Sequence, residues 1–140
     1  MKPRAFLDTG PLVAFLDRRD RYHGWATEQW AQIDPPLFTC EPVLSEACFL
    51  LRDVPGGAPA VLDLVVRGVL RIGFALEAEA AAIRNLMVRY ANVPMSLADA
   101  CLVRMAEQRP GSRLLTLDRD FRLFRTHGRR VIPTAMPPDL

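Results

Sequence analysis

The chain has little lysine, histidine or cysteine, and it has no long apolar run. Lys2 is its only lysine, and every other basic residue is arginine. Cys40, Cys48 and Cys101 cannot all pair within the chain and lack CxxC spacing, so we expect reduced core thiols in a cytoplasmic protein. No stretch approaches the roughly 20 apolar residues of a membrane span, and the residues before Asp8 do not resemble a signal peptide. The sequence therefore predicts no association with membranes.

Net charge does not identify a ligand. The 18 basic and 16 acidic residues leave a charge of only +2, whereas a domain that binds nucleic acid through bulk charge is clearly basic. The arginine bias has two explanations: guanidinium forks suit phosphate groups, and codon usage rich in GC would produce the same bias. The high share of hydrophobic residues, 50%, also has two explanations. It predicts either an Ala- and Leu-rich helical core or apolar surface that is buried in a dimer or under a partner.

Short apolar runs alternate with helical patterns along the chain, which is typical of an α/β protein with a parallel sheet. We expect a three-layer α/β/α fold with a central parallel sheet of four to five strands. A chain of 140 residues is the size of one domain, which we assign to residues 1–134, followed by a Pro-rich, loosely held tail over residues 135–140. Strands are expected at residues 4–8, 37–40, 69–74, 113–117 and 130–133. Helices are expected at about residues 11–17, 22–33, 42–53, 59–67, 77–90, 96–109 and 119–125.

Four carboxylates stand in apolar surroundings, where carboxylates are unusual. Asp8 and Asp118 each end an apolar run that is expected to be a strand. Glu46 and Asp99 are isolated charges in apolar helical segments. Burial of an ionised carboxylate is costly unless hydrogen bonds, a basic side chain or a cation offset the cost.

These four acids can converge on one cleft. Asp8 and Asp118 lie at the carboxyl ends of strands that we expect side by side in the middle of the sheet, where ligands bind in such folds. Asp99 lies on the first turn of a helix, and Glu46 lies on the helix after the second strand. Acids without a histidine or cysteine nearby favour a hard divalent cation, Mg²⁺ or Mn²⁺.

Each acid also has a purely structural explanation. Asp8 could cap the first helix, and Asp118 could cap the short helix expected at residues 119–125. Asp99 lies three residues after Ser96, which is close to capping-box spacing. Glu46 could face solvent. One shared metal site accounts for all four acids at once, whereas these explanations must hold separately.

Four motifs in this order resemble the PIN domain of VapC-type toxin ribonucleases. The similarity extends over about residues 5–134, and each motif alone is weak whereas the series is specific. The motifs are FLDTGPLV at residues 6–13, LSEA at 44–47, PMSLADA at 94–100 and LTLDRDF at 115–121.

The resemblance implies an acidic catalytic site and Mg²⁺-dependent cleavage of RNA phosphodiester bonds, with Mn²⁺ as a substitute ion. It also implies a homodimer and inhibition by a cognate antitoxin protein. The implied catalytic residues are Asp8, Glu46, Asp99 and Asp118. The implied metal ligands are Asp8, Asp99 and Asp118, with Glu46 and Asp120 acting through water. The supporting polar residues are Thr9, Ser96 and Thr116.

RNA would also need contacts to its phosphates and bases. Tyr22 or Trp25 could stack on a base, although helical spacing favours Trp25 as a core residue. The arginines that could contact phosphate are Arg18, Arg19, Arg21, Arg119, Arg122, Arg129 and Arg130.

Three other functions remain open. One is a catalytically idle PIN-like scaffold that acts through protein partners. A second is another Mg²⁺-dependent phosphoryl-transfer hydrolase, but its usual Asp-x-Asp motif would need an acid at Gly10. A third is an aspartic protease, whose Asp-Thr-Gly triplet is present at residues 8–10, but that fold is all-β and this chain has mostly helical patterns.

Overall fold

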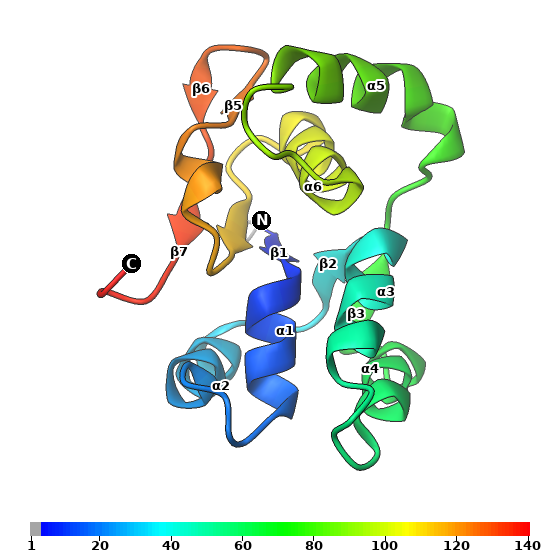
Figure 1. The fold of residues 1–140 in the computed structure, drawn as a ribbon, viewed down its shortest axis with the longest axis vertical. Helices are drawn as coiled ribbons and strands as arrows, with labels where there is room; N and C mark the ends of the chain where they lie inside the picture. Colours follow the sequence, from blue (N-terminus) through cyan, green and yellow to red (C-terminus); the bar gives the residue numbers. More distant parts are fainter. Residues whose placement is uncertain (1–3) are drawn as a thin grey trace.

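Five short parallel strands form the central sheet of the computed structural model, which describes residues 4–140 (Figure 1). Residues 1–3, which the predicted domain includes, lie outside the described residues. The strand order is β3-β2-β1-β4-β7, so β1 lies in the middle with β4 beside it. The predicted α/β fold and parallel sheet are confirmed. The strands are β1 (Ala5–Leu7), β2 (Leu37–Thr39), β3 (Leu70–Ile72), β4 (Arg113–Leu115) and β7 (Thr134–Ala135).

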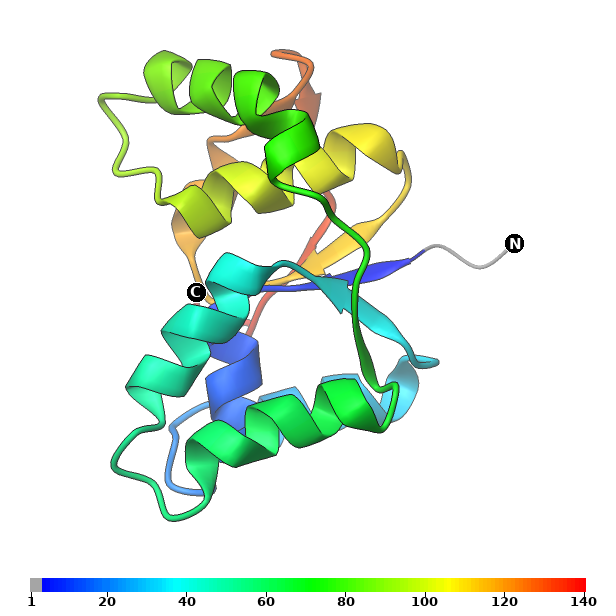
Figure 2. The same ribbon diagram turned by 90° about the vertical axis from the view of Figure 1, so that its right-hand side faces the viewer.

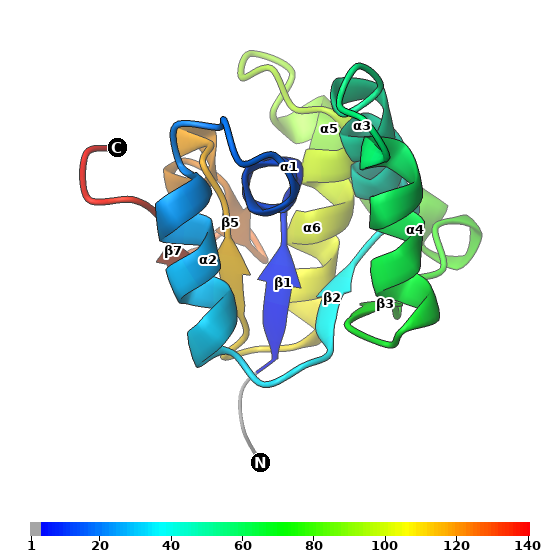
Figure 3. The same cartoon turned by 90° about the horizontal axis from the view of Figure 1, so that it is seen from below.

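Helices cover both faces of the sheet and complete the predicted three layers (Figures 2 and 3). α5 and α6 lie on one face, and α1, α2 and α4 lie on the other. α3 follows the carboxyl end of β2 and contacts α1, α4 and α6, so it bridges the two helical layers. The helices are α1 (Thr9–Leu16), α2 (His23–Gln32), α3 (Glu41–Leu50), α4 (Gly57–Val66), α5 (Ala80–Arg89) and α6 (Leu97–Gln108).

The helices on both faces of the sheet explain why strands such as β1 are continuous apolar runs and do not alternate between apolar and polar residues. A sheet that is covered on both faces can bury successive side chains of a strand, as it does for Phe6 and Leu7 in β1 and for Leu114 and Leu115 in β4. α6 is buried nearly all round, because eight of its 12 residues are buried. A carboxylate on the first turn of this helix therefore lies against the core.

The helices are those that the sequence predicts, with ends that differ by up to three residues. The predicted helix at 77–90 begins with a 3₁₀ turn, η1 (Glu77–Glu79), before α5, and the predicted helix at 119–125 is the 3₁₀ helix η2 (Arg119–Arg122). Among residues 4–140, no helix is long and apolar enough to cross a membrane.

The predicted position of the fifth strand, residues 130–133, is wrong. β6 (Arg130–Val131) pairs antiparallel with β5 (Arg125–Thr126) in a separate hairpin. The turn between them contains His127 and Gly128, both with positive φ, a conformation that closes tight hairpins. The fifth strand of the central sheet is β7, which pairs with β4 through Leu114↔Thr134 and Leu115↔Ala135.

The prediction of a loose tail is also wrong. Ala135, its first predicted residue, pairs with β4 and is buried. Pro137 is buried as well, and Met136 packs against the core. The side chain of Asp139 and the carbonyl of Leu140 accept hydrogen bonds from residues elsewhere in the chain. The segment after β7 is therefore part of the folded surface.

Candidate active site

A cavity of about 670 Å³ opens beyond the carboxyl ends of β1 and β4. This acid cavity lies at the edge of the sheet where the sequence predicts a site. Its lining includes Asp8, Glu46, Asp99 and Asp118, which we call the four site acids. The remaining lining residues are Thr9, Gly10, Leu50, Ser96, Leu117, Arg119 and Leu140.

Asp8 is held at the end of β1 by hydrogen bonds to both carboxylate oxygens. Its backbone N–H continues the sheet by donating to the carbonyl of Leu115 at 3.0 Å. Oδ1 accepts the backbone N–H of Thr9 at 2.8 Å, and Oδ2 accepts the hydroxyl of Thr116 at 2.7 Å. The residue is only 7% exposed. Asp8 therefore caps α1, as one explanation from the sequence required, and also lines the cavity.

Asp118 is connected to Asp8 through Thr116. The Thr116 hydroxyl donates to Asp8 and accepts the backbone N–H of Asp118 at 3.0 Å. The carboxylate Oδ1 of Asp118 accepts the backbone N–H of Asp120 at 2.8 Å, which starts η2. Asp120 is half-buried and is not one of the described residues that line the acid cavity.

Asp99 and Ser96 form a capping box at the start of α6, as the spacing predicts. The Asp99 N–H donates to the Ser96 hydroxyl, and the Ser96 N–H donates to Oδ2 of Asp99, both at 3.0 Å. Asp99 is 7% exposed because the rest of α6 is packed in the core. The structural and functional explanations of this residue are thus compatible.

Glu46 lies on α3 at the rim of the cavity. Its side chain is exposed, as the alternative explanation predicts, but its Oε2 accepts the hydroxyl of Thr9 at 2.9 Å. This bond turns the carboxylate toward the other acids. Glu46 is therefore the member of the set that has the most contact with solvent.

The charges of these acids act on one another. Burial raises the pKa of Asp8 to about 7, although the hydrogen bonds from Thr116 and Thr9 lower it and the charges of Asp99 and Asp118 raise it further. Burial likewise raises the pKa of Asp99 to about 6, with contributions from the charges of Asp118 and Glu46. A cation in the cavity would remove both the repulsion and part of the desolvation cost.

The side chains of the cavity have the chemistry that a hard cation requires, but their positions do not form a coordination site. All ligands offered are carboxylate and hydroxyl oxygens, which Mg²⁺ and Mn²⁺ prefer. In the described part of the chain, however, no three acidic, histidine or cysteine side chains lie close enough together to hold an ion. Each site acid has at least one oxygen bonded to a hydroxyl or backbone N–H. Side-chain rotation would have to accompany metal binding.

Three features of the cavity were not predicted. Leu140 lines it, which the expectation of a loose tail did not allow. Leu50, at the end of α3, also lines it although it is more than half exposed. Gly10 allows a close approach, because a Cβ at this position would lie 3.0 Å from the side chain of Leu117.

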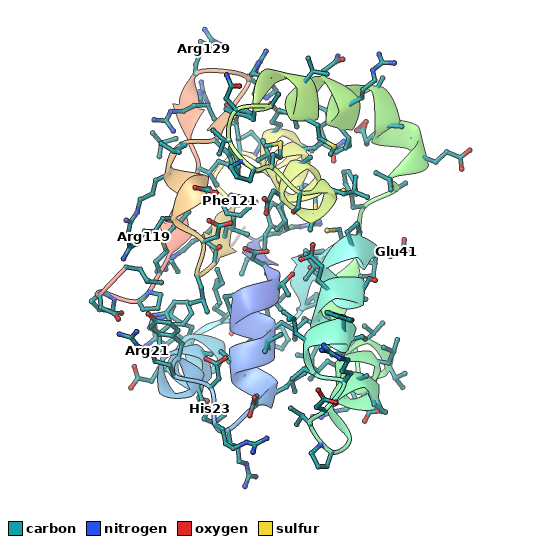
Figure 4. The ribbon with its side chains drawn as sticks, viewed as in Figure 1. Arg21, His23, Glu41, Arg119, Phe121 and Arg129 are labelled. Carbon is teal, nitrogen blue, oxygen red and sulfur yellow. The ribbon has the colours of Figure 1, made fainter. Side chains whose placement is uncertain are left out.

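The candidate RNA-contacting residues occupy several surfaces. Arg21 and Arg119 lie on one edge of the molecule, with Arg129 farther along it in the β5–β6 hairpin (Figure 4). Arg119 is the only one of the seven predicted arginines among the described residues that line the acid cavity. Trp25 packs against the core, as its spacing predicts. Tyr22 is half-buried and has the guanidinium of Arg21 5.2 Å from its ring centroid.

The comparisons with known proteins agree with this architecture. The sequence matches the family model of the PIN domain over residues 5–125. The crystal structure of Mycobacterium tuberculosis VapC20, described as a sarcin–ricin loop cleaving toxin, is similar with a TM-score of 0.68 and 24% sequence identity, covering 79% of this chain and 86% of that one. At this identity the likeness concerns the fold. No curated protein matches the sequence significantly. Because the match spans most of the chain and includes all four site acids, the protein belongs to the PIN-domain family.

Proposed function

We propose that the protein is a Mg²⁺-dependent endoribonuclease that hydrolyses RNA phosphodiester bonds at the acid cavity. The observation that carries the proposal is the convergence of four acids, from segments spread over more than 100 residues, on one cavity of a PIN domain. We further propose that the protein is the toxin of a toxin–antitoxin pair and acts in the cytoplasm. The similarity to a structure described as an RNA-cleaving toxin supports this part.

Asp8, Asp99 and Asp118 would hold the metal ion, with Glu46 and Asp120 acting through water. Mg²⁺ keeps several of its own waters, so two or three carboxylates suffice. When bound, the ion lowers the pKa of a coordinated water and balances the negative charge that develops on the phosphate. Mn²⁺ would serve as a substitute.

The chain's own residues orient the acids and remove the proton. Thr116 fixes the carboxylate of Asp8 and the backbone of Asp118 with one hydroxyl. Ser96 fixes Asp99 at the start of α6 with two groups: its backbone N–H donates to the Asp99 carboxylate, and its hydroxyl accepts the Asp99 N–H. Glu46 would accept the proton of the attacking water at its carboxylate and pass it to solvent, and its exposure and its hydrogen bond to Thr9 support this role.

Exposed apolar side chains support the proposal that the chain forms a homodimer and binds an antitoxin. Phe49 and Leu50 on α3 are 61% and 54% exposed, and Leu62 and Val66 on α4 are 47% and 83% exposed. α3 and α4 contact each other, so these side chains extend over neighbouring helices. Exposed apolar surface of this kind favours contact with another protein.

A catalytically idle scaffold is the second candidate, because the acids are not yet arranged to hold an ion. Calorimetry with Mn²⁺ separates the two functions. Binding that is lost in Asp99→Asn supports the nuclease, and the absence of binding by the wild-type protein supports the scaffold.

The test of activity is RNA cleavage in Mg²⁺ by the wild-type protein beside Asp8→Asn and Asp99→Asn. We expect both variants and the wild type in EDTA to lose cleavage. Asp53→Asn is the matched control, because Asp53 is an exposed acid at the end of α3 outside the cavity. Cleavage that survives in Asp8→Asn or in EDTA would contradict the proposal.

A further inference from the structure

The segment after β7 runs beside the acid cavity. β7 is parallel to β4, so the chain leaves it at the same edge of the sheet where Asp118 follows β4. Residues 136–140 then cross the surface between η2 and the start of α2, where Figure 4 places Arg119 and Arg21 on the same edge of the molecule. Leu140 reaches the acid cavity itself.

Two residues of this segment are bound by groups that would also bind RNA. Oδ2 of Asp139 accepts a hydrogen bond from Arg21 at 2.8 Å and another from the hydroxyl of Tyr22 at 3.1 Å. The carbonyl of Leu140 accepts a hydrogen bond from the guanidinium of Arg122 at 2.8 Å. Arg21 and Tyr22 thus donate to an anionic oxygen of Asp139, as they would to an oxygen of an RNA phosphate.

Four side chains beside this segment make up what we call the tail surface: Arg21, Tyr22, Arg119 and Arg122. The guanidinium of Arg21 lies 5.2 Å from the centroid of the Tyr22 ring, and the charge of Arg119 acts on the Tyr22 hydroxyl. Tyr22 is half-buried, and guanidinium groups beside an accessible aromatic ring are a combination with which proteins hold single-stranded nucleic acid. The tail surface borders the acid cavity, because Arg119 is part of that surface and also lines the cavity, as does Leu140.

We propose that a single RNA strand enters the acid cavity across the tail surface, and that Asp139 occupies the place of an RNA phosphate on Arg21 and Tyr22. This inference rests on the proposed function and adds the positioning residues and the regulation of the same site. Residues 136–140 then compete with the substrate, so the free protein is partly self-blocked.

The block is weak, because the ion pair that holds the segment is exposed to solvent. The side chains of Arg21 and Asp139 are 77% and 47% exposed, and ion pairs between such exposed groups contribute little. A polyanion that contacts several arginines at once can therefore displace the segment. The competition lowers affinity for RNA without preventing binding.

The experiment measures the dissociation constant of a fluorescein-labelled single-stranded RNA by anisotropy, in EDTA so that no metal-dependent cleavage occurs. We expect Asp139→Asn to bind about fivefold more tightly than wild type and Arg21→Gln to bind about tenfold more weakly. Arg21→Gln should also reduce the slope of affinity against salt concentration by about 0.7, the loss of one phosphate contact to a single strand.

The double variant isolates the competition. If Asp139 acts by occupying Arg21, then Asp139→Asn should give no gain in the Arg21→Gln background. Asp53→Asn and Arg52→Gln are matched controls, because Asp53 and Arg52 are an exposed acid and arginine, 3.9 Å apart, at the end of α3. Both should change the affinity by less than about twofold.

Three results would overturn the inference. They are an Asp139→Asn variant that binds RNA no more tightly than Asp53→Asn, an equal gain from Asp139→Asn with and without Arg21, and no detectable RNA binding by Asp139→Asn. Cleavage in Mg²⁺ keeps this outcome separate from the proposed function. Variants that bind RNA in the expected order but never cleave it refute the nuclease and support RNA binding at the tail surface. A wild type that cleaves RNA with no effect of Asp139 supports the nuclease and refutes the role of the tail surface.

Discussion

Two groups of charged side chains lie along helix α6, and they are stabilised in different ways. Toward its end, Arg104 pairs with Glu79 and Glu107, each at 3.3 Å, in a group we call the paired cluster. At its start, Asp99 lies with the other site acids, and among residues 4–140 none of these four has a salt bridge with a basic side chain. Hydroxyls and backbone N–H groups are their partners instead.

This difference separates a structural role from a functional one. The paired cluster joins η1 to α6 and also holds the β5–β6 turn, because the His127 N–H donates to Glu107 at 2.7 Å. Its single positive charge, on Arg104, is shared between the two glutamates, and N–H groups of His127 and Gln108 also bond the glutamate oxygens. The site acids keep a net negative charge that the fold does not balance. Burial raises the pKa values of Asp8 and Asp99, and the charges of the neighbouring acids raise them further. Unbalanced charge in a cavity marks a place where a ligand is expected.

The largest expected effect is on catalysis. Asp8→Asn should lower the rate of Mg²⁺-dependent RNA cleavage at least about 100-fold, because it removes a charged metal ligand. The same change should raise the free energy of unfolding by about 1 kcal/mol at pH 8, because burial and the neighbouring acids disfavour the ionised form of Asp8. Cleavage assays and urea denaturation measure the two quantities. A loss of stability together with activity would mean that Asp8 is mainly structural.

The opposite pattern is expected in the paired cluster. Arg104→Met should lower the free energy of unfolding by about 2 kcal/mol, because Glu79 and Glu107 would keep their negative charges without the guanidinium group that balances them. Cleavage per folded molecule should change by less than about twofold, since the cluster is outside the acid cavity. Urea denaturation followed by cleavage at low urea would measure both. A variant that is as stable as wild type would contradict the structural role of this cluster.

A smaller effect is expected from the hydroxyl that joins two site acids. Thr116→Val removes a hydrogen bond that lowers the pKa of Asp8, so that pKa should rise. Cleavage at pH 7 should fall about tenfold, and the deficit should shrink as pH increases because Asp8 must be ionised. The pH–rate profile measures the shift of its acidic limb to higher pH. Thr126→Val, a change of another buried threonine in the β5–β6 hairpin, should leave the profile in place.

The smallest effect concerns stability and pH. The pKa values of Asp8 and Asp99, about 7 and about 6 in the folded protein, lie above their usual value of 3.8. The stability that these groups contribute is therefore complete below about pH 4 and is lost as pH rises through 6 and 7. Between pH 6 and pH 7, we expect the free energy of unfolding of the wild type to fall by about 1 kcal/mol more than that of an Asp8→Asn, Asp99→Asn double variant. Mg²⁺ should reverse the loss, and equal pH dependence of the two proteins would contradict the coupling.

Much of the fold and part of the site can be predicted from the sequence. Asp8 and Asp118 each end an apolar run, and the α/β order places those runs on neighbouring central strands, as β1 and β4 are. Asp99 is identifiable by its spacing from Ser96. The roles assigned to these residues stay a prediction. The sequence could not decide whether Glu46 faces solvent or the other acids, because this depends on how α3 is rotated against α1 and α6.

The errors lie where local sequence carries no pattern. β7 has only two residues, Thr134 and Ala135, between prolines that suggest a loop. Its pairing is imposed by the open edge of β4, which no property of residues 134–135 reveals. The hairpin turn at His127 and Gly128 was a readable signal, since a glycine in such a turn readily adopts positive φ.

The most direct test of the account is the pKa of the Asp8 carboxyl, measured by ¹³C NMR without and with saturating Mg²⁺. We predict a value near 7 without the ion, set by burial and by the neighbouring acids, and a fall of more than about one unit when Mg²⁺ is added. A pKa that Mg²⁺ leaves unchanged would contradict the claim that these four acids form one metal-dependent site.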